Sequence, residues 1–470
     1  MRSLRCGSLP TRRDPPMPPP SRHHCGGPAP LSGPRGDPRI KCVLLYTLLP
    51  GPPLGTPFVD TAMRRRRFAL CTLFLLPGLG ISSWVTRTPA IRDALGASTA
   101  EMGLVLFGLS AGSMLGILAT GPLVARLGAR PIIVFGTAAL VLSMPVIGAG
   151  AALSAPVLVA LGLFLFGLGM GGGEIALNVE GAEVEKALSE PLLPRLHGFF
   201  SLGTVVGAVA GIAFTATGFP VAWHLGIVGL LALAASAAVL GSVPAGTGRA
   251  HPRADDRGTG PGRALWKDTG LVLIGVIVLA MALAEGTAND WLPLIMVDGH
   301  GFDPAAGSMV YAVFAASMTV GRFAGGYFLA RFGRAAVLAA SAVAGVVGMG
   351  LVAGADSQVL AAAAVVLWGL GASLGFPVAL SAAGDSGPDS AARVALVATL
   401  GYVAFLVGPP VLGFLGEAYG LRGALIVPLV FVAVAGLLSS AARPREAAGA
   451  DAQRDGAGTG AGEHRDDLPR

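Results

Sequence analysis

The chain has 470 residues, of which 53% are hydrophobic and only 13% are charged, and its formal net charge is +6. Because a soluble domain carries about 25% charged residues, this composition excludes an ordinary soluble fold and indicates a surface that faces lipid. The basic residues lie between apolar runs and not along one helix face, which argues against nucleic acid as a partner. The Cys residues, at positions 6, 25, 42 and 71, lack metal-ligand spacing and a paired framework, so we expect no metal site and no disulfide.

Residues 1–62 differ in composition from the rest of the chain, because they are rich in Pro and contain no apolar run long enough to cross a bilayer. Two interpretations stay open for this segment. It is either a disordered cytosolic extension or a misannotated start, with Met63 as the true initiator, and we favour the second. At the other end, residues 443–470 are rich in Ala, Gly, Asp and Arg, and we expect a disordered tail.

Between residues 68 and 442, twelve apolar stretches of about 20 residues each predict an all-α membrane protein with 12 transmembrane helices. The predicted spans are 68–88, 101–125, 130–150, 155–180, 196–217, 220–243, 268–296, 304–329, 334–355, 357–383, 393–416 and 421–442. The longest connection, 244–267, contains Pro, Gly and charged residues, which is typical of a linker between two six-helix halves, 63–243 and 268–442. Lys and Arg concentrate on the side of the N-terminus, so both termini are predicted to be cytosolic.

The chain repeats a short loop motif at the same place in each predicted half. Residues 121–128 follow span two, residues 326–333 follow span eight, and both read G-x-x-x-A-R-x-G. The shared positions are Gly121, Arg126 and Gly128 in the first copy and Gly326, Arg331 and Gly333 in the second. Two halves with matching loops are typical of the duplicated architecture of one large transporter class.

These features resemble the major facilitator superfamily over residues 63–442. The loop signature of that family is G-x-x-x-D-R-x-G, and this chain matches its Gly and Arg positions but has Ala125 and Ala330 where the family has Asp. In the family this Asp helps to latch the cytosolic side, so the resemblance leaves the latch unexplained here. Arg322, four residues before the second copy, is expected to pack with that loop as part of the gate. The resemblance implies a multi-pass protein of the bacterial cytoplasmic (inner) membrane.

Ionisable residues inside the predicted spans are candidates for function, because a charge in the membrane is costly unless it has a role. Glu174 and Asn178 in span four are four residues apart and share a helix face, and Glu285 and Asn289 in span seven repeat this spacing. Asp290 follows, nearer the outer surface. The alternative is that these groups are structural and bond to neighbouring helices. By contrast, the acidic residues at 180, 183 and 185 are expected to form a solvated cytosolic helix end.

The resemblance gives these pairs a role. In the superfamily, spans one, four, seven and ten line the central cavity, and the proton-coupled fucose permease branch has a Glu-x-x-x-Asn pair in span four, where the Glu takes and releases the coupling proton. Glu174 and Asn178 match that pattern. Trp84 and Trp368 lie in spans one and ten and offer faces for stacking a sugar ring, with Trp368 favoured because it lies well inside its span; packing or an interfacial position is the alternative.

The function we expect is therefore secondary transport of a small polar solute by alternating access, with a sugar as one candidate, the proton as the coupling ion and no cofactor. Span five has the close-packing pattern Gly203, Gly207 and Gly211 but lacks the Gly-Pro of drug antiporters, which favours symport. Proton-coupled efflux stays as an alternative, and a non-transporting sensor on the same fold is the alternative from another class. The sequence has no nucleotide-binding loop, catalytic triad or metal set, so we expect no enzyme. We expect a monomer in contact with membrane lipid.

Overall fold

A computed structural model describes residues 61–188, 192–249, 265–387 and 390–443 of the chain. The regular structure of this part is helical throughout, and ten of its helices are long and apolar enough to cross a membrane. Helices form because a bilayer core offers backbone N–H and C=O groups no partner except each other. Our predictions for residues 1–60, 250–264 and 444–470 lie outside the described residues.

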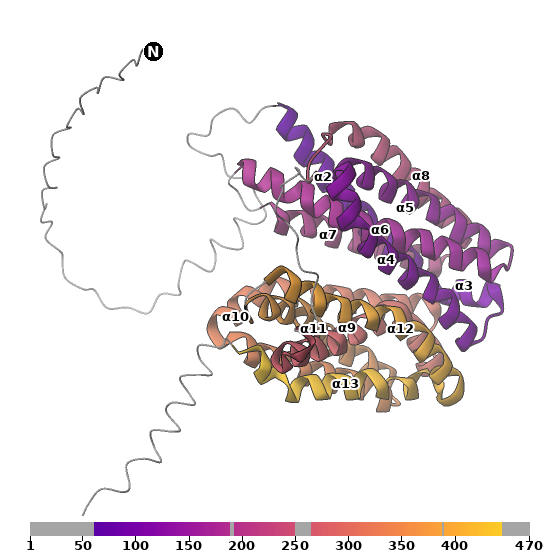
Figure 1. Ribbon diagram of the computed structural model, residues 1–470. Helices are drawn as coiled ribbons and strands as arrows, with labels where there is room; N and C mark the ends of the chain where they lie inside the picture. Colours follow the sequence, from indigo (N-terminus) through magenta and orange to yellow (C-terminus); the bar gives the residue numbers. More distant parts are fainter. Residues whose placement is uncertain (1–60, 189–191, 250–264, 388–389, 444–470) are drawn as a thin grey trace, which may run out of the picture. The chain divides into compact units, whose positions relative to one another are not determined.

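The first predicted half contains one long helix for each predicted span. These are α2 (Thr61–Val85), α4 (Thr99–Leu127), α5 (Ala129–Ala152), α6 (Pro156–Leu188), α7 (Leu193–Ala216) and α8 (Val221–Val239), which ends in a 3₁₀ turn, η1 (Leu240–Ser242). A short additional helix, α3 (Thr88–Leu95), follows α2 and lies between the first two predicted spans, apart from its first residue. In Figure 1 these helices form one bundle, coloured indigo to magenta.

The second half begins with η2 (Leu265–Lys267) and α9 (Thr269–Leu294), which continues into a π-helical segment, η3 (Ile295–Gly299). It then contains α10 (Pro304–Gly354), α11 (Gln358–Gly384), α12 (Ser390–Ala424), α13 (Ile426–Leu437) and η4 (Ser439–Ala442). The helix α10 covers two predicted spans and is broken at Gly333, where φ is +76°. The last predicted span is divided among α12, α13 and η4, and α12 has a similar break at Gly420. The count of twelve crossings therefore stays a prediction.

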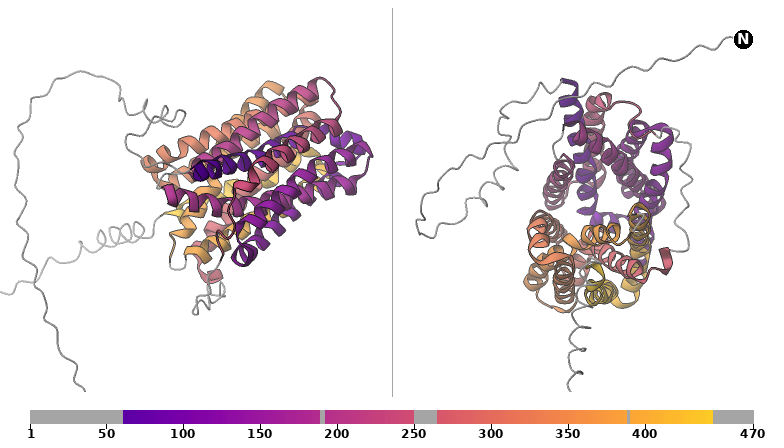
Figure 2. Two further views of the ribbon diagram at one scale, coloured as in Figure 1. Left: turned by 90° about the horizontal axis from the view of Figure 1, so that it is seen from above. Right: turned by 60° about the vertical axis from the view of Figure 1, so that its left-hand side comes forward.

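The two bundles lie side by side, as Figure 1 and the right-hand view of Figure 2 show. Within the first bundle α4 and α5 pack on α6 and α2 packs on α7, and within the second α10 packs on α11 and α9 on α12. The bundles meet through α4 with α12 and through α7 with α10. The glycine pattern of span five does bring α7 close to α2, because a Cβ at Gly203 would lie 2.1 Å from the carbonyl oxygen of Leu75.

The acidic end of α6 differs from our expectation of a solvated helix end. The side chain of Glu180 is fully buried, and its Oε1 accepts a hydrogen bond from Nε of Arg66 at 2.6 Å. The prediction was wrong for Glu180 because α2 begins early enough to place Arg66 beside α6. The Oε2 atom of Glu185 accepts hydrogen bonds from the backbone N–H groups of Leu192 and Leu193 at the start of α7, whereas Glu183 is exposed, as expected.

Candidate functional site

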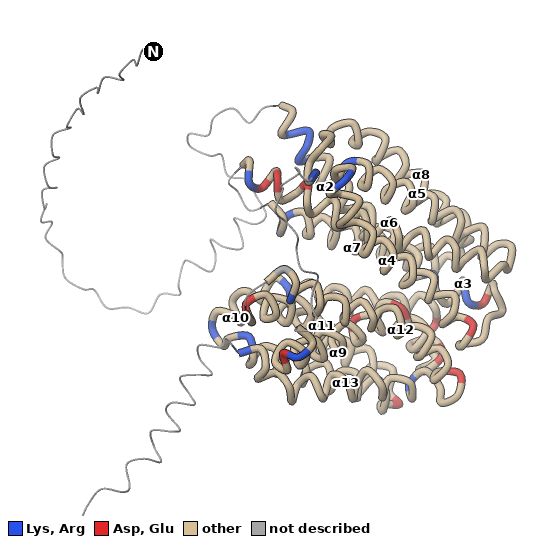
Figure 3. The backbone as a smooth tube through the Cα atoms, in the orientation of Figure 1, with Lys and Arg blue, Asp and Glu red and all other residues tan. Residues whose placement is uncertain are grey.

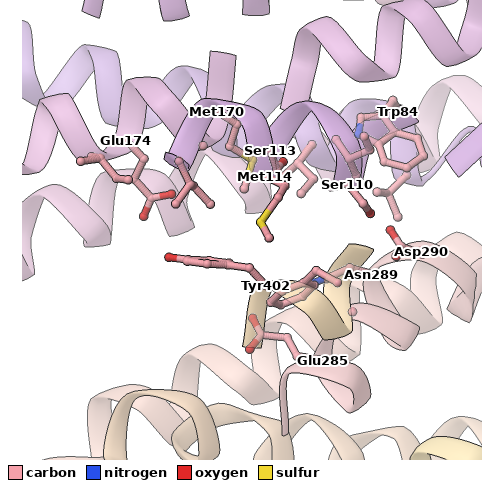
Figure 4. A pocket seen from close by; sticks show the side chains of 18 of the residues that line it. Trp84, Ser110, Ser113, Met114, Met170, Glu174, Glu285, Asn289, Asp290 and Tyr402 are labelled. Carbon is pink, nitrogen blue, oxygen red and sulfur yellow. The ribbon is translucent and has the colours of Figure 1, made fainter. Parts of the chain in front are cut away.

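A cavity of about 300 Å³ lies between the two bundles, lined by α2, α4 and α6 from the first and by α9 and α12 from the second. Figure 4 shows its polar side chains approaching from both sides. The sequence-predicted residues that line it are Trp84, Glu174, Asn178, Glu285, Asn289 and Asp290. The structure therefore brings together both Glu-x-x-x-Asn pairs, which lie 111 positions apart in the sequence.

Glu174 points from α6 into the cavity (Figure 4), and Asn178 lies one turn further along the same helix. Both side chains are half-buried. No hydrogen bond or ion pair joins the Glu174 carboxyl to another described residue, although it lies within electrostatic range of Glu285 and Arg322. Glycines just before Glu174 keep α6 close to α4, since a Cβ at Gly171 would lie 2.7 Å from the Ser113 carbonyl oxygen. The free carboxyl is thus held at the cavity wall by a tightly packed helix pair.

Glu285, the corresponding residue of α9, has a different environment. Its Oε1 accepts a hydrogen bond from Nη2 of Arg322 at 2.9 Å, and Nε of Arg322 donates to the carbonyl oxygen of Ser373 at 3.4 Å. Asn289 accepts a weak hydrogen bond from the hydroxyl of Tyr311 at 3.4 Å. We expected Arg322 to pack with the second loop motif, but the structure directs its guanidinium to Glu285, because Arg322 lies three turns before the break in α10.

Asp290 lies deeper in the protein than its sequence position suggested. Its side chain lines the cavity, the residue is only 6% exposed, and no described residue donates a hydrogen bond to its carboxyl. Figure 4 shows this carboxyl pointing toward Ser110 of α4 and toward Trp84 of α2. The cavity therefore has a second carboxylate without a described partner, at the end away from Glu174.

The two candidate tryptophans have different places. Trp84 lines the cavity, and its Nε1 is buried without a hydrogen-bond partner in the described structure. Trp368, which the sequence favoured for stacking, is not among the lining residues. It is fully buried, its Nε1 donates to the carbonyl oxygen of Ala284 at 3.2 Å, and its ring packs edge-on against Phe314. In this structure Trp368 is a packing residue because α11 presents that face to α9 and α10.

Several lining residues were missed by the sequence analysis: Ser110, Ser113, Met114, Met170, Tyr402 and Phe405. Tyr402 carried a usable signal, because it lies deep in an apolar span and not at an end, where membrane aromatic residues concentrate. The two serines carried little signal, because the hydroxyl of Ser in a membrane helix often donates a hydrogen bond to a backbone carbonyl of its own helix. The methionines carried none, because Met is as common in packing as in ligand sites.

The two loop copies have the same backbone at their last glycine. Gly128 has φ +87° and ψ 169°, and Gly333 has φ +76° and ψ 168°, a combination that is essentially restricted to glycine. The first glycines, Gly121 and Gly326, are exposed positions inside helices. The side chains of the two arginines, Arg126 and Arg331, are exposed and have no described partner. The motif thus fixes two sharp helix breaks, while a latch built on its arginines is not seen among the described residues.

Polar contacts link the two bundles at the end of the cavity near Asp290. Both Nη atoms of Arg92 on α3 bond to the carboxylate of Asp298 in η3, and the hydroxyl of Ser308 on α10 donates to the carbonyl oxygen of Thr86 at 2.8 Å. The backbone N–H of Ala100 donates to Glu417 at 3.2 Å. We call this set of contacts between the bundles the α3 seal.

A family model described as the Major Facilitator Superfamily matches residues 10–184 and 195–398. This match covers more than half of the chain, so the chain belongs to the superfamily, a class of multi-pass membrane transporters, and the resemblance seen in the loop motifs is confirmed. An uncharacterized MFS-type transporter of Yersinia pestis is 31% identical over 368 residues, which make up 77% of this chain and 92% of that protein. The protein is therefore a transporter and not an enzyme.

Two solved structures are similar in fold. A mutant of the nucleoside transporter NupG has a TM-score of 0.64 and 16% identity, covering 80% of this chain and 98% of that chain. The E. coli fucose:proton symporter FucP has a TM-score of 0.56 and 18% identity, with the same coverage of 80% and 98%. At these identities the likeness concerns the fold alone.

Proposed function

We propose that the protein is a secondary active transporter that moves a small polar solute together with protons by alternating access. The observation that carries this proposal is Glu174, a carboxyl without a described partner at the wall of a cavity between the two halves. Closing an apolar cavity over an ionised carboxylate is costly, whereas a protonated carboxyl is neutral and can be enclosed. Proton uptake at Glu174 therefore permits a transition that the charged form resists.

The pair of Glu285 and Arg322 supports a division of roles between the halves. Because this carboxylate is already paired with Arg322, it links α9 to α10, while Glu174 is left to exchange the proton. Asn178, Asn289 and Tyr402 supply amide and hydroxyl groups that suit a polar solute. The similar solved structures include a fucose:proton symporter and a nucleoside transporter, and both of these solutes are small and polar.

We further propose twelve crossings with both termini cytosolic, in the inner membrane of a bacterium, for a protein that works as a monomer. In Figure 3 the Lys and Arg residues gather mainly at the end of the bundles where α2 begins, and acidic residues are common at the opposite end. By the positive-inside rule the end with α2 faces the cytosol. The α3 seal then lies on the outer side.

The test uses the full chain, purified and reconstituted in liposomes. A thermal-shift screen of sugars, polyols, nucleosides and amines selects a ligand, because a solute that binds the folded state stabilises it. Uptake is then measured with an imposed pH gradient. Wild-type protein is expected to accumulate the solute, whereas Glu174→Gln, which removes the proton site, should only equilibrate it to a concentration ratio of about one while still exchanging it.

Glu183→Gln is the matched control, since Glu183 is an exposed carboxylate on the same helix and does not line the cavity. It should accumulate solute as the wild type does. Gradient-driven accumulation by Glu174→Gln at the wild-type level would remove the proton role. Accumulation only with the opposite gradient indicates efflux, and the absence of any flux in the wild type favours the sensor.

A further inference from the structure

The cavity is acidic, and this limits the solutes that it can accept. Its charged lining residues, among those the structure describes, are Glu174, Glu285 and Asp290. Arg322 pairs with Glu285 and neutralises one of them. Arg87, on the chain segment after Trp84, is 3% exposed and bonds to the hydroxyl of Thr215 and the carbonyl oxygen of Phe219, away from the cavity. Two carboxylates thus remain without a cation from the described part of the protein.

Asp290 has the environment of a counter-ion that lacks its partner. Only 6% of its surface is exposed, it lines the cavity, and no described group bonds to its carboxyl. A buried carboxylate in this situation is unfavourable unless an opposite charge or hydrogen-bond donors compensate it. The described residues supply neither, so the carboxyl is either protonated or compensated by a cationic solute, and the groups that line this end of the cavity suit the second.

The groups around Asp290 suit a positively charged nitrogen. The side chain of Ser110 lies beside the carboxyl in Figure 4, and the Trp84 ring lines the same end of the cavity. An ammonium group donates hydrogen bonds to carboxylate and hydroxyl oxygens, and it is attracted to the face of an indole. An anionic solute would meet two carboxylates and find no free cation among the described lining residues.

We propose that the end of the cavity at Asp290 binds the ammonium group of an amine-bearing polar solute, with Asp290 as its counter-ion and Ser110 and Trp84 as its walls. The inference rests on the proposed transport function and names the substrate class. It assigns different tasks to the two unpaired carboxyls: Asp290 holds the solute, and Glu174 takes the proton.

The test compares solutes that differ in charge but not in shape, on the purified full chain in detergent. The probes are glucosamine, glucose and glucuronate, and the smaller pair ethanolamine and ethylene glycol, at about pH 6, where the amines are protonated. In the wild type we expect each amine to raise Tm more than its neutral counterpart, and glucuronate to have the least effect. If no amine stabilises the wild type more than its neutral counterpart, the proposal is wrong, and this comparison needs no variant.

Asp290→Asn should abolish the advantage of the amine, weakening its apparent affinity about tenfold or more, because one partner of a buried charge pair is lost. Its effect on the response to the neutral counterpart should be much smaller. Asp290→Glu keeps the charge and should retain the preference, as should Glu183→Gln. An amine preference that persists in Asp290→Asn contradicts the assignment of the site.

Failure of this inference and failure of the proposed function give different results. Glu174→Gln should keep the amine preference in the binding assay even though it loses coupling in liposomes. A wild type that accumulates a neutral solute with protons but shows no amine preference overturns the Asp290 site alone. A wild type that prefers amines but is indifferent to the pH gradient overturns the proton coupling alone.

Discussion

Glu174 and Glu285 show what spacing along a chain can and cannot predict about single residues. The repeated Glu-x-x-x-Asn pattern predicts one helix face for each pair, because residues four apart share a face, and both pairs line one cavity in the structure. It did not predict that Glu285 is paired and Glu174 is not. That difference depends on Arg322, which comes from another helix and whose partner cannot be read from its own neighbours in sequence. The sequence could not show whether Trp368 faces the cavity, for a related reason. A helix that is apolar all round does not reveal which of its faces meets the cavity.

His300, in the connection between η3 and α10, gives a pH prediction at the residue scale. Its Nε2 bonds to the Val352 carbonyl oxygen at 2.9 Å, and its Nδ1 is buried without a described partner. Burial lowers the pKa of the imidazole, an effect that Arg422 reinforces and that the Val352 bond and Asp356 oppose. The folded-state pKa thus lies below the unfolded value of about 6.5. The neutral imidazole of His300 therefore stabilises the fold fully above the unfolded-state pKa. This stabilisation is lost as the pH falls through the folded-state pKa.

We therefore expect Tm to fall as the pH is lowered below about 6.5 and His300→Gln to reduce that fall, since Gln can still donate to Val352 but does not titrate. The measurement is a Tm profile against pH for both proteins. An unchanged slope in His300→Gln would assign the pH dependence to other groups.

At the scale of elements, the break in α10 depends on a single backbone conformation. A side chain at Gly333 is disfavoured by φ alone, because no described atom lies within 4 Å of the position a Cβ would take. Gly333→Ala should therefore lower the stability by about 1–3 kcal/mol. Gly326→Ala is the matched control, an equally open but helical position, where Ala is neutral or slightly stabilising. Equal Tm values for the two variants would contradict this account.

The α3 seal gives a second prediction at this scale. Arg92→Gln removes the bidentate pair with Asp298 and should favour opening of the cavity at that end. Both side chains are partly exposed, so we expect a contribution of about 1 kcal/mol, or roughly a fivefold change in population. Labelling of Ser110→Cys, in a background without other cysteines, by an impermeant thiol reagent measures this opening.

Asp93→Asn is the matched control for the seal. Asp93 also bonds to Arg92, at 2.7 Å, but it lies on the same helix and does not join the bundles. Its variant should label as slowly as the parent protein. If Asp93→Asn accelerates labelling as much as Arg92→Gln does, then the charge on α3 matters and the link between the bundles does not.

For the whole molecule, hydropathy predicted the positions of the helices well, because crossing a bilayer imposes length and apolarity on each of them. It predicted the helix breaks less well: the turn after the loop motif is the glycine break of α10, and the last predicted span is divided among three segments. The sequence carried no signal for α3 or for the α3 seal, since Arg92 and Asp298 are 206 positions apart and pair only when the bundles meet. Contacts between the two halves could not be predicted from one sequence.

The π-helical segment η3 sets the direction in which the side chains that follow α9 point. It joins the cavity residue Asp290 to the seal residue Asp298 within one continuous helical rod. A π turn holds one more residue than an α turn, and each residue of an α-helix advances the side chain by about 100°. Winding Ile295–Gly299 as an ordinary α-helix without removing a residue would turn Asp298 away from Arg92 by up to about that angle. The extra residue therefore acts as a spacer that keeps the cavity and the seal in angular register.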